Sequence, residues 1–263
     1  MINSDKDIIK NLISELKLVN KNYFKPLIFN LNDESDLKEF ESLITSNKKQ
    51  LKLANTIENQ LLELHLTRNP GRQISESERA EWLEAWKKDH DVYRFGNWVY
   101  YPWSGLLNQV LPKEDFIELR TSRNKYKIGE SEQALLGQKK VGVIGLSVGQ
   151  SVALTMAIER VFGTIRIADF DHLDLSNLNR IRSGISNVSV PKTILVAREI
   201  AEIDPYLKVE LYDQGITQEN IVDFIGEGEE KLDLLIEECD SLDIKILARA
   251  QARAKGVPVL MDT

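Results

Sequence analysis

The strongest constraint on the fold is an alternation of apolar, strand-like runs with helical stretches in the second half of the chain. Five apolar runs fit strands, at 140–145, 164–168, 208–212, 232–237 and 257–261. Four stretches with helical spacing of apolar residues lie between them, at about 149–162, 191–203, 217–225 and 242–255. Strands that alternate with helices in this way build a parallel sheet with helices on its faces. We therefore predict an α/β fold with a doubly wound, mainly parallel sheet.

Residues 1–90 have a different pattern, in which apolar residues recur at helical spacing. Helices are predicted at 5–19, at 35–45 and at about 47–67. A fourth helix, which carries Trp82, is expected to begin after Ser75 or Ser77. We therefore expect an α-helical N-terminal region to precede the sheet.

Residues 91–116 are rich in aromatic side chains that suit strands. Gly96-Asn97 and Ser104-Gly105 are turn signals within this segment. We predict a hairpin-like aromatic connector that leads into a domain at 117–263. Two roles are open for the connector: a small core that seals the helices onto the next domain, or an aromatic face that binds a partner peptide.

Composition narrows the class of protein. The chain has 263 residues, 42% of them hydrophobic, and a formal net charge of −7. Lys and Arg are scattered along the chain, so no nucleic-acid partner is expected. The N-terminus has acidic residues where a signal peptide needs basic ones, and no apolar stretch is long enough to span a bilayer. We expect no membrane partner and a cytoplasmic location. The single cysteine, Cys239, cannot form an intramolecular disulfide, which is consistent with a reducing compartment.

A glycine-containing loop follows the first predicted strand of the sheet. Gly145 ends that strand and Gly149 begins a helix, so backbone N–H groups between them can approach a ligand without an intervening Cβ. The loop is poor in glycine, and a purely structural turn is an equal alternative. Asp169 ends the second strand, where an acid can hold a ribose hydroxyl. Helix capping is the alternative role for Asp169.

A polar run from Asp169 to Arg180 follows the second predicted strand. It reads Asp-Phe-Asp-His-Leu-Asp-Leu-Ser-Asn-Leu-Asn-Arg. An Asn and an Arg that follow a ribose-binding acid can reach the phosphates of the same nucleotide. A domain that binds NAD for hydride transfer does not need the Asn and Arg that follow the acid, so the run argues against an NAD-dependent oxidoreductase. Asp171, His172 and Asp174 also have a simpler interpretation as solvated loop residues.

Five motifs occur in order over residues 117–263. They are Arg120-Thr-Ser-Arg123-Asn124, Asp169-Phe-Asp171 with Ser176-Asn-Leu-Asn-Arg180, Pro191-Lys192, Asp204-Pro205 and Cys239-Asp240-Ser241. With these motifs the chain resembles the ThiF-type adenylating enzymes, which include the ubiquitin-activating enzymes and bacterial enzymes that charge sulfur-carrier proteins. The resemblance implies a Rossmann-like fold, with ATP and Mg²⁺ as cofactors. It also implies attack of a carboxylate on the α-phosphate of ATP, giving an acyl-adenylate and pyrophosphate.

The resemblance also implies roles for the residues that match the family's motifs. Nucleotide contacts fall on Gly145, Ser147, Gly149, Asp169, Asp171, Asn177, Arg180 and Lys192. Asp240 matches the family's Mg²⁺-binding aspartate, with a helix N-cap as the alternative. Arg123 matches an arginine that reaches into the partner subunit's site, so a homodimer is expected; an exposed helix-start charge is the alternative. Arg123, Arg180, Lys192 and Asp240 are the candidate catalytic residues.

Three departures from the family's pattern leave the activity open. The loop from Gly145 to Gly149 is either one residue shorter than the usual Gly-x-Gly-x-x-Gly or has two glycines replaced. Ile181 stands where relatives often carry Gln. The last strand stops at Asp262-Thr263, whereas the family continues with further strands, so we expect a fragment or a truncated member.

We predict ATP-dependent adenylation of a carboxylate, such as the C-terminus of a small carrier protein or a related peptide or small acid. A second cysteine that could accept a thioester is absent from the sequence, which argues against a covalent transfer step of the ubiquitin-activating type. The alternative is a catalytically weak or inactive nucleotide-binding or regulatory module of the same fold.

Overall fold

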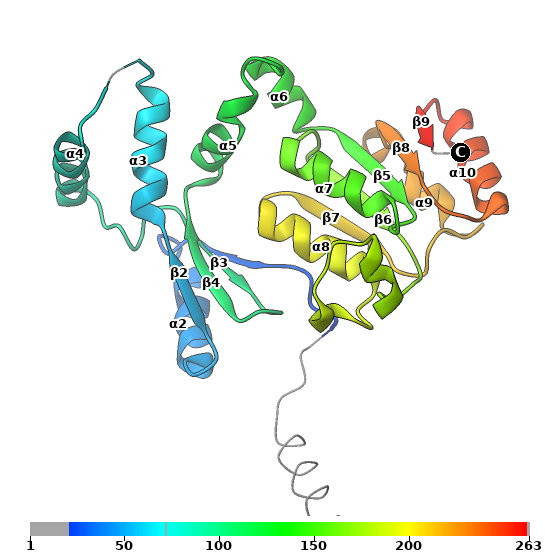
Figure 1. Cartoon of the computed structure of the whole chain (residues 1–263), viewed down its shortest axis with the longest axis horizontal. Coiled ribbons are helices and arrows are strands. Elements are labelled where there is room, and N and C mark those ends of the chain that lie inside the picture. Colours follow the sequence, from blue (N-terminus) through cyan, green and yellow to red (C-terminus); the bar gives the residue numbers. More distant parts are fainter. Residues whose placement is uncertain (1–20, 72, 262–263) are drawn as a thin grey trace, which may run out of the picture.

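The computed structural model describes residues 21–71 and 73–261, which form two regions side by side (Figure 1). The helix predicted at 5–19 lies outside the described residues. The second region contains a five-stranded sheet with the strand order β7-β6-β5-β8-β9. Its strands are β5 (Lys140–Ile144), β6 (Thr164–Ala168), β7 (Lys208–Tyr212), β8 (Leu234–Glu237) and β9 (Val259–Met261). All four strand pairings are parallel, which confirms the predicted doubly wound sheet.

Helices cover both faces of this sheet (Figure 1). They are α7 (Gly149–Glu159), α8 (Lys192–Ile203), α9 (Ile221–Ile225) and α10 (Leu242–Ala254). Successive strand residues point to opposite faces. Val143 and Ile236 accordingly pack with α7 and α8, whereas Ile144 and Leu235 pack with α9 and α10.

The strand order places a switch point between β5 and β8. From β5 the chain runs outward through β6 to β7, and it then returns to the other side of β5 to form β8 and β9. In open parallel sheets, ligands bind at the carboxyl ends of the strands beside such a point. A ligand site is therefore expected at the loops that follow β5, β6 and β8.

The helix predicted at 217–225 is shorter than expected, because α9 begins only at Ile221. The Thr217 hydroxyl accepts hydrogen bonds from the N–H groups of Glu219 and Asn220. The side-chain oxygen of Asn220, Oδ1, accepts the Thr217 N–H in return. These side-chain bonds fold residues 217–220 into a turn instead of a first helical turn.

The N-terminal region is not all-helical, contrary to the prediction. Two strands, β1 and β2, form within residues 1–90 and join β3 and β4 of the following segment in a four-stranded sheet with the order β1-β3-β4-β2. Its elements are β1 (Leu27–Phe29), α2 (Glu34–Asn47), β2 (Lys52–Asn55), α3 (Ile57–Arg68), α4 (Glu76–Asp89), β3 (Asn97–Tyr101) and β4 (Leu106–Val110). Only the later part of the helix predicted at 47–67 forms, as α3, because Lys52–Asn55 form β2, which pairs in parallel with β4. The hydrogen bonds of this pairing override the helical spacing of the sequence.

Other predictions for this region are confirmed. α2 covers the helix predicted at 35–45. α4 begins directly after Ser75, whose side chain accepts the Glu78 N–H while the Glu78 carboxylate accepts the Ser75 N–H. This reciprocal capping box explains why the helix starts at that serine.

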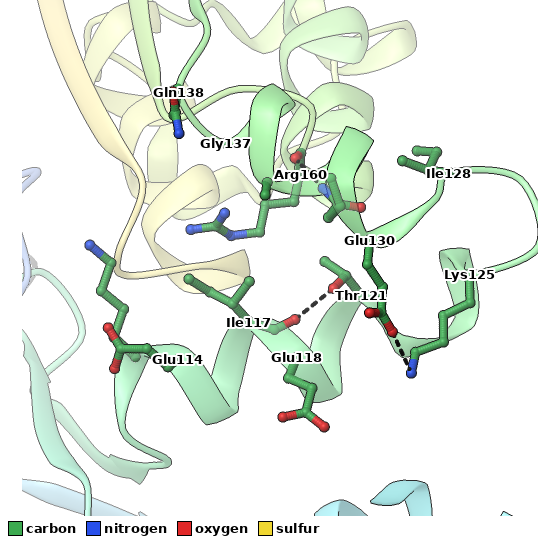
Figure 2. A pocket seen from close by; sticks show the side chains of 13 residues that line it. Glu114, Ile117, Glu118, Thr121, Lys125, Ile128, Glu130, Gly137, Gln138 and Arg160 are labelled. Atoms are coloured by element: carbon green, nitrogen blue, oxygen red, sulfur yellow. Dashed lines mark hydrogen bonds and ion pairs between the residues drawn. The ribbon is translucent and has the colours of Figure 1, made fainter.

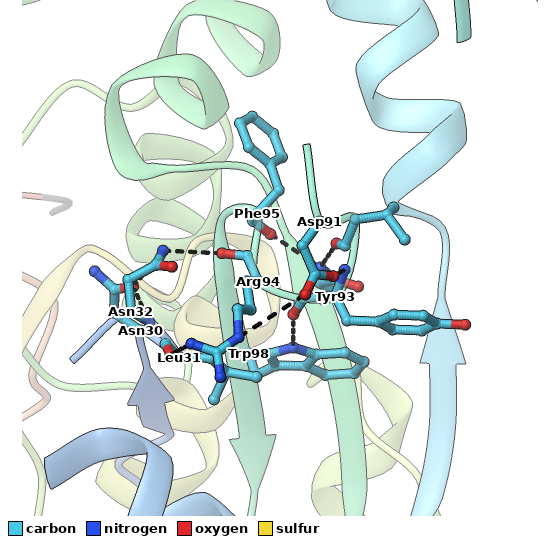
Figure 3. Close-up of polar contacts among 10 residues, drawn as sticks. Asn30, Leu31, Asn32, Asp91, Tyr93, Arg94, Phe95 and Trp98 are labelled. Carbon is cyan, nitrogen blue, oxygen red and sulfur yellow. Dashed lines mark hydrogen bonds and ion pairs between the residues drawn. The ribbon is translucent and has the colours of Figure 1, made fainter. Parts of the chain in front are cut away.

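The predicted hairpin is confirmed as β3 and β4, and the loop before β3 ties the N-terminal strands together (Figure 3). The indole N–H of Trp98 donates to the Tyr93 carbonyl at 2.9 Å. The Arg94 guanidinium donates to the Leu31 carbonyl at 3.1 Å, and the Asn32 amide donates to the Arg94 carbonyl at 3.0 Å. The loop therefore holds β3 against the segment that follows β1.

The hairpin also contacts the parallel-sheet region. The Tyr101 hydroxyl donates to the Ala201 carbonyl of α8 at 3.2 Å. The Tyr206 hydroxyl accepts from the Asn97 amide at 2.8 Å and donates to the Leu111 carbonyl at 2.9 Å. These contacts favour the role of the connector as a core that seals the two regions together. The division of the chain into segments 1–90, 91–116 and 117–263 stays a prediction.

Two further helices, α5 (Lys113–Thr121) and α6 (Glu130–Leu136), lead from the hairpin into β5. Within 21–71 and 73–261, none of the helices combines the length and the apolar character that crossing a bilayer requires.

Candidate functional site

The carboxyl edge of the parallel sheet brings two loops into direct contact. Gly145 follows β5 with a φ of +86°, a conformation that side chains rarely adopt. A Cβ at this position would lie 2.8 Å from the backbone N of Cys239 and 2.8 Å from the backbone of Glu238. The glycine loop, residues 145–149, therefore packs against the loop that follows β8.

Asp169 follows β6 and holds the same glycine loop. Its Oδ2 accepts the Leu146 N–H at 2.7 Å, and its Oδ1 accepts the Asp171 N–H at 2.8 Å. Neither donor lies in the first turn of a helix, so helix capping is not what this carboxylate does. An ionised carboxylate has about four lone-pair sites. Asp169 therefore keeps acceptor capacity for a ligand hydroxyl.

Lys192 begins α8 and is buried, with 3% of its surface exposed. Its Nζ donates to Ser147 Oγ at 3.1 Å and to Asp171 Oδ2 at 2.8 Å. His172 is exposed, which agrees with a solvated loop residue, and its backbone forms an isolated bridge with Pro191. Lys192 thus joins the glycine loop to the acidic end of β6.

Asn177 and Arg180 lie on and just after a short 3-10 helix, η2 (Leu175–Asn179). Asn177 is buried, and its side-chain oxygen accepts the Asp174 N–H at 3.0 Å. Arg180 is exposed, and its guanidinium donates to Asn179 Oδ1 at 3.0 Å. Arg180 is therefore a cation that can turn toward a ligand without breaking a core contact.

Ile181, which stands in place of the family's Gln, belongs to the core. It packs with Leu173 and Leu195 in an apolar cluster and is 3% exposed. Position 181 therefore anchors the backbone next to Arg180 and offers no polar contact of its own.

Asp240 is exposed in the loop between β8 and α10. Ser241, and not Asp240, is the N-cap residue of α10, so the capping role considered for Asp240 is not observed. Burial and the nearby Glu237 carboxylate raise the pKa of the Cys239 thiol to about 11. A thiol with that pKa is protonated at neutral pH and is a poor nucleophile.

Arg123 does not join the other predicted residues within one chain. It is exposed in η1 (Ser122–Asn124), directly after α5. Arg120, in the same motif, donates to the carbonyls of Ala157 and Ile203 at 2.6 and 3.3 Å, near the C-terminal ends of α7 and α8. α7 starts in the glycine loop and has 11 residues, so it spans about 16 Å. Arg123 therefore lies at the opposite edge of the sheet from the glycine loop of its own chain.

A cavity of about 450 Å³ lies on the side of this motif, between α5, α6 and the end of α7 (Figure 2). Arg160 reaches toward it from the end of α7, and Ile117 faces it from α5. The Arg160 guanidinium pairs with the buried Asp204 carboxylate at 2.9 Å, which balances its charge. The remaining lining contains both lysines and glutamates, so no class of ligand is favoured there.

The carboxyl edge also contains a polar pair that the sequence motifs did not indicate. Gln150, in the first turn of α7, is 2% exposed, and its side-chain amide donates to Glu199 Oε2 at 2.7 Å and to the Arg182 carbonyl at 3.2 Å. A glutamine and a glutamate within helices give no sequence signal of this kind, because such residues are usually solvated.

Comparisons with known proteins agree with this architecture. A Mycobacterium tuberculosis (strain CDC 1551 / Oshkosh) protein named "Uncharacterized protein MT1398" is 46% identical over 166 residues, which are 63% of this chain and 23% of that protein. "Probable adenylyltransferase/sulfurtransferase MoeZ" of the same organism is 31% identical over 133 residues, which are 50% of this chain and 33% of that protein. The chain thus spans less than two thirds of the length of these relatives.

A solved structure has the same fold in this region. The Escherichia coli tRNA N6-threonylcarbamoyladenosine dehydratase, TcdA, solved in complex with ATP, matches with a TM-score of 0.51 at 25% identity, over 55% of this chain and 58% of that one. The same enzyme was also solved with AMP. The family model described as "ThiF family" matches residues 121–261, which is more than half of the 263 residues. On this evidence, the chain belongs to the ThiF family.

Proposed function

We propose that this protein binds ATP with Mg²⁺ and uses it to adenylate a carboxylate, with release of pyrophosphate. The observation that carries the proposal is Lys192, a buried cation that joins the glycine loop to the acidic end of β6. Its partner Asp171 is 51% exposed, so the lysine faces a side of the site that a phosphate oxygen could reach. Relatives that are named as adenylyltransferases or were solved with ATP support the same conclusion.

Each part of the nucleotide has a candidate partner at the carboxyl edge. Asp169 would accept a ribose hydroxyl, and the N–H groups of the glycine loop would face the phosphates. Asn177 and Arg180 would contact the phosphates from η2. Negative charge shifts among the phosphate oxygens as the carboxylate attacks, and these preorganised groups would stabilise it. The protein's contribution would then be positioning and electrostatic stabilisation.

Asp240 is the candidate ligand for Mg²⁺. This ion usually keeps several waters and binds through one or two carboxylates together with substrate phosphates. A single exposed carboxylate, in the loop that packs against Gly145, fits such an ion. Among the residues that the structure describes, no group of three or more His, Cys, Asp or Glu could hold a metal alone. The ion would neutralise phosphate charge when it arrives with ATP.

The carboxylate that we propose is the C-terminus of a small carrier protein, or a related peptide or small acid. We also propose a homodimer in which Arg123 of one subunit reaches the nucleotide of its partner. The exposed position of Arg123, at the edge away from its own glycine loop, supports this arrangement. An arginine supplied across an interface would stabilise charge in the same way as an arginine finger.

A nucleotide-binding regulatory module of the same fold is the second candidate. It is favoured by the loop Gly145-Leu-Ser-Val-Gly149, which departs from the family's glycine pattern. Such a module would bind ATP without forming an acyl-adenylate, so turnover separates the two candidates.

Arg180→Ala tests the nucleotide site. Arg180 is exposed, so the variant is expected to fold normally. A hydrogen bond to a charged group contributes about 1.5–3 kcal/mol, so we expect the affinity for ATP·Mg²⁺ to fall at least about tenfold by calorimetric titration. Arg182→Ala removes a second exposed cation two residues away and should leave the affinity unchanged. Equal affinity in Arg180→Ala and the wild type would contradict the assignment.

Turnover is tested by exchange of labelled pyrophosphate into ATP, with a panel of small acids and C-terminal peptides. Exchange that depends on one of these carboxylates would support adenylation. ATP binding without exchange for any of them would favour the regulatory module. Binding of NAD⁺ in place of ATP would overturn both.

A further inference from the structure

The side chain of Gln150 connects three segments of the candidate site. It lies in the first turn of α7, next to Gly149, and is almost fully buried. Its amide nitrogen donates one hydrogen bond to Glu199 on α8 and another to the backbone carbonyl of Arg182. One side chain thus links the start of α7, the middle of α8 and the segment that carries Arg180.

The bond to Glu199 forms the second of two links between the glycine-loop segment and α8. Lys192 and Glu199 are two turns apart and lie on one face of α8. Lys192 contacts Ser147 in the loop, and Glu199 contacts Gln150 just beyond it. The second link therefore fixes how α7 and α8 lie relative to each other behind the phosphate-facing residues.

The bond to the Arg182 carbonyl acts on a different part of the site. Arg180 is exposed, whereas Ile181 is held in the core by Leu173 and Leu195. The Gln150 amide fixes the carbonyl of the next residue. The backbone that carries Arg180 is thus held by an apolar contact and by a hydrogen bond, and only the Arg180 side chain is free to follow a ligand.

We propose that Gln150, oriented by Glu199, is a positioning residue that holds the Arg180 segment over the glycine loop for binding of the ATP phosphates. This inference rests on the proposed function, because it assigns a role to Gln150 only if Arg180 contacts the nucleotide. Neither Gln150 nor Glu199 touches the ligand in this arrangement. The effect on ATP would pass through the position of Arg180.

The test compares Gln150→Leu with the wild type. Leucine keeps most of the side-chain volume and removes both hydrogen bonds. Loss of a buried hydrogen bond that positions a charged group should lower the affinity for ATP·Mg²⁺ about fivefold to tenfold. Gln109→Leu is the matched control, because Gln109 is also buried and its side-chain amide also donates two hydrogen bonds, to the carbonyls of Val92 and Phe95 in the N-terminal region. The control should lower thermal stability by a similar amount without changing the ATP affinity.

A double-mutant cycle gives a readout that a merely structural role would not change. If Gln150 acts through Arg180, the Arg180→Ala substitution should cost at least threefold less ATP affinity in the Gln150→Leu background than in the wild type. Strictly additive losses would overturn the inference. So would equal losses of ATP affinity in Gln150→Leu and Gln109→Leu.

Variants at Glu199 keep the inference testable if Gln150→Leu does not fold. Glu199→Gln retains an oxygen that accepts from Gln150 and should keep the ATP affinity within about twofold, whereas Glu199→Leu should lower it severalfold. Equal affinities in these two variants would overturn the inference. Failure of the proposed function looks different: the wild type would not bind ATP, or Arg180→Ala would bind it as well as the wild type.

Discussion

Replacement of Lys192 by methionine is the sharpest single test of the nucleotide site. Methionine has a similar length and no charge, so Lys192→Met removes the bonds to Ser147 and Asp171 with little change in volume. The question is whether the loss falls on folding or on binding. The solvent exposure of the Asp171 carboxylate, which stays behind without its partner, decides between the two.

The stability cost of Lys192→Met should be small. Removal of one member of a fully buried ion pair costs about 3–5 kcal/mol, because the remaining charge stays buried. Here the charge that remains, on Asp171, is 51% exposed and can be hydrated. We therefore expect a loss of about 1 kcal/mol, or roughly 2–4 °C in Tm for a chain of this size.

The loss of ATP affinity should be much larger. A charge-assisted bond from a buried ammonium to a phosphate contributes about 1.5–3 kcal/mol, which corresponds to a roughly 10- to 150-fold increase in Kd. Calorimetric titration with ATP·Mg²⁺ measures this change, and thermal unfolding of the ligand-free variant measures the stability cost.

Lys139→Met is the matched control for Lys192→Met. Lys139 pairs with Asp233 at 2.9 Å, next to the start of β5 and therefore at the opposite edge of the sheet. Its loss should leave the Kd for ATP unchanged. A folded Lys192→Met protein that binds ATP as tightly as the wild type would refute the assignment of Lys192 to the phosphates.

Two further predictions concern pH and backbone geometry. Burial raises the pKa of Glu199 from 4.5 to about 7. As pH rises, the unfolded chain therefore loses this proton before the folded chain does. Glu199 should lower the stability of the fold progressively between about pH 4.5 and 7, and by a constant amount above that range. Glu199→Gln should therefore raise Tm relative to the wild type at pH 8 and lose most of this gain at pH 5, and an equal gain in melts at both pH values would contradict the burial effect. Gly145→Ala should lower Tm more than Gly71→Ala, since the φ values of +86° and +84° match while a Cβ meets backbone only at position 145. Equal losses of Tm would show that the contact between the two loops is not tight.

The parallel sheet could be predicted because its signals are local. The runs predicted at 140–145 and 164–168 are apolar, short and separated by a stretch of helical period, and the observed strands, Lys140–Ile144 and Thr164–Ala168, agree with them to within one residue. The polar residues after these runs then share one edge, because parallel strands end on the same side. The position of Asp169 and of Lys192 at that edge follows from this topology.

The N-terminal strands could not be predicted in the same way. β1 has three residues and β2 has four, and every residue of β2 is exposed, so no alternation of apolar and polar residues marks it. β2 forms because β4 offers backbone partners to Lys52–Asn55 from more than fifty positions away. A window along the sequence does not contain that information.

The link from Gln150 to Glu199 and Arg182 was missed for a related reason. It depends on how α7 and α8 pack, which no motif records. A glutamine at the start of a helix has a solvated side chain in most proteins. Here the packing of α7 against α8 and the segment at Arg182 buries this glutamine and makes it a hydrogen-bond donor.

The glycine loop departs from the family's pattern but keeps a glycine at both positions where its own backbone geometry requires one. Glycine is required where φ is positive or where a Cβ would clash, and the loop has glycine at both such places: Gly145 has a φ of +86°, and a Cβ on Gly149 would lie 2.8 Å from Val143. Val148 is 50% exposed, so its side chain leaves the loop toward solvent. Ser147 adds a hydroxyl that accepts from Lys192. The loop therefore combines the two glycines that its backbone requires with a side-chain contact from Ser147 to Lys192.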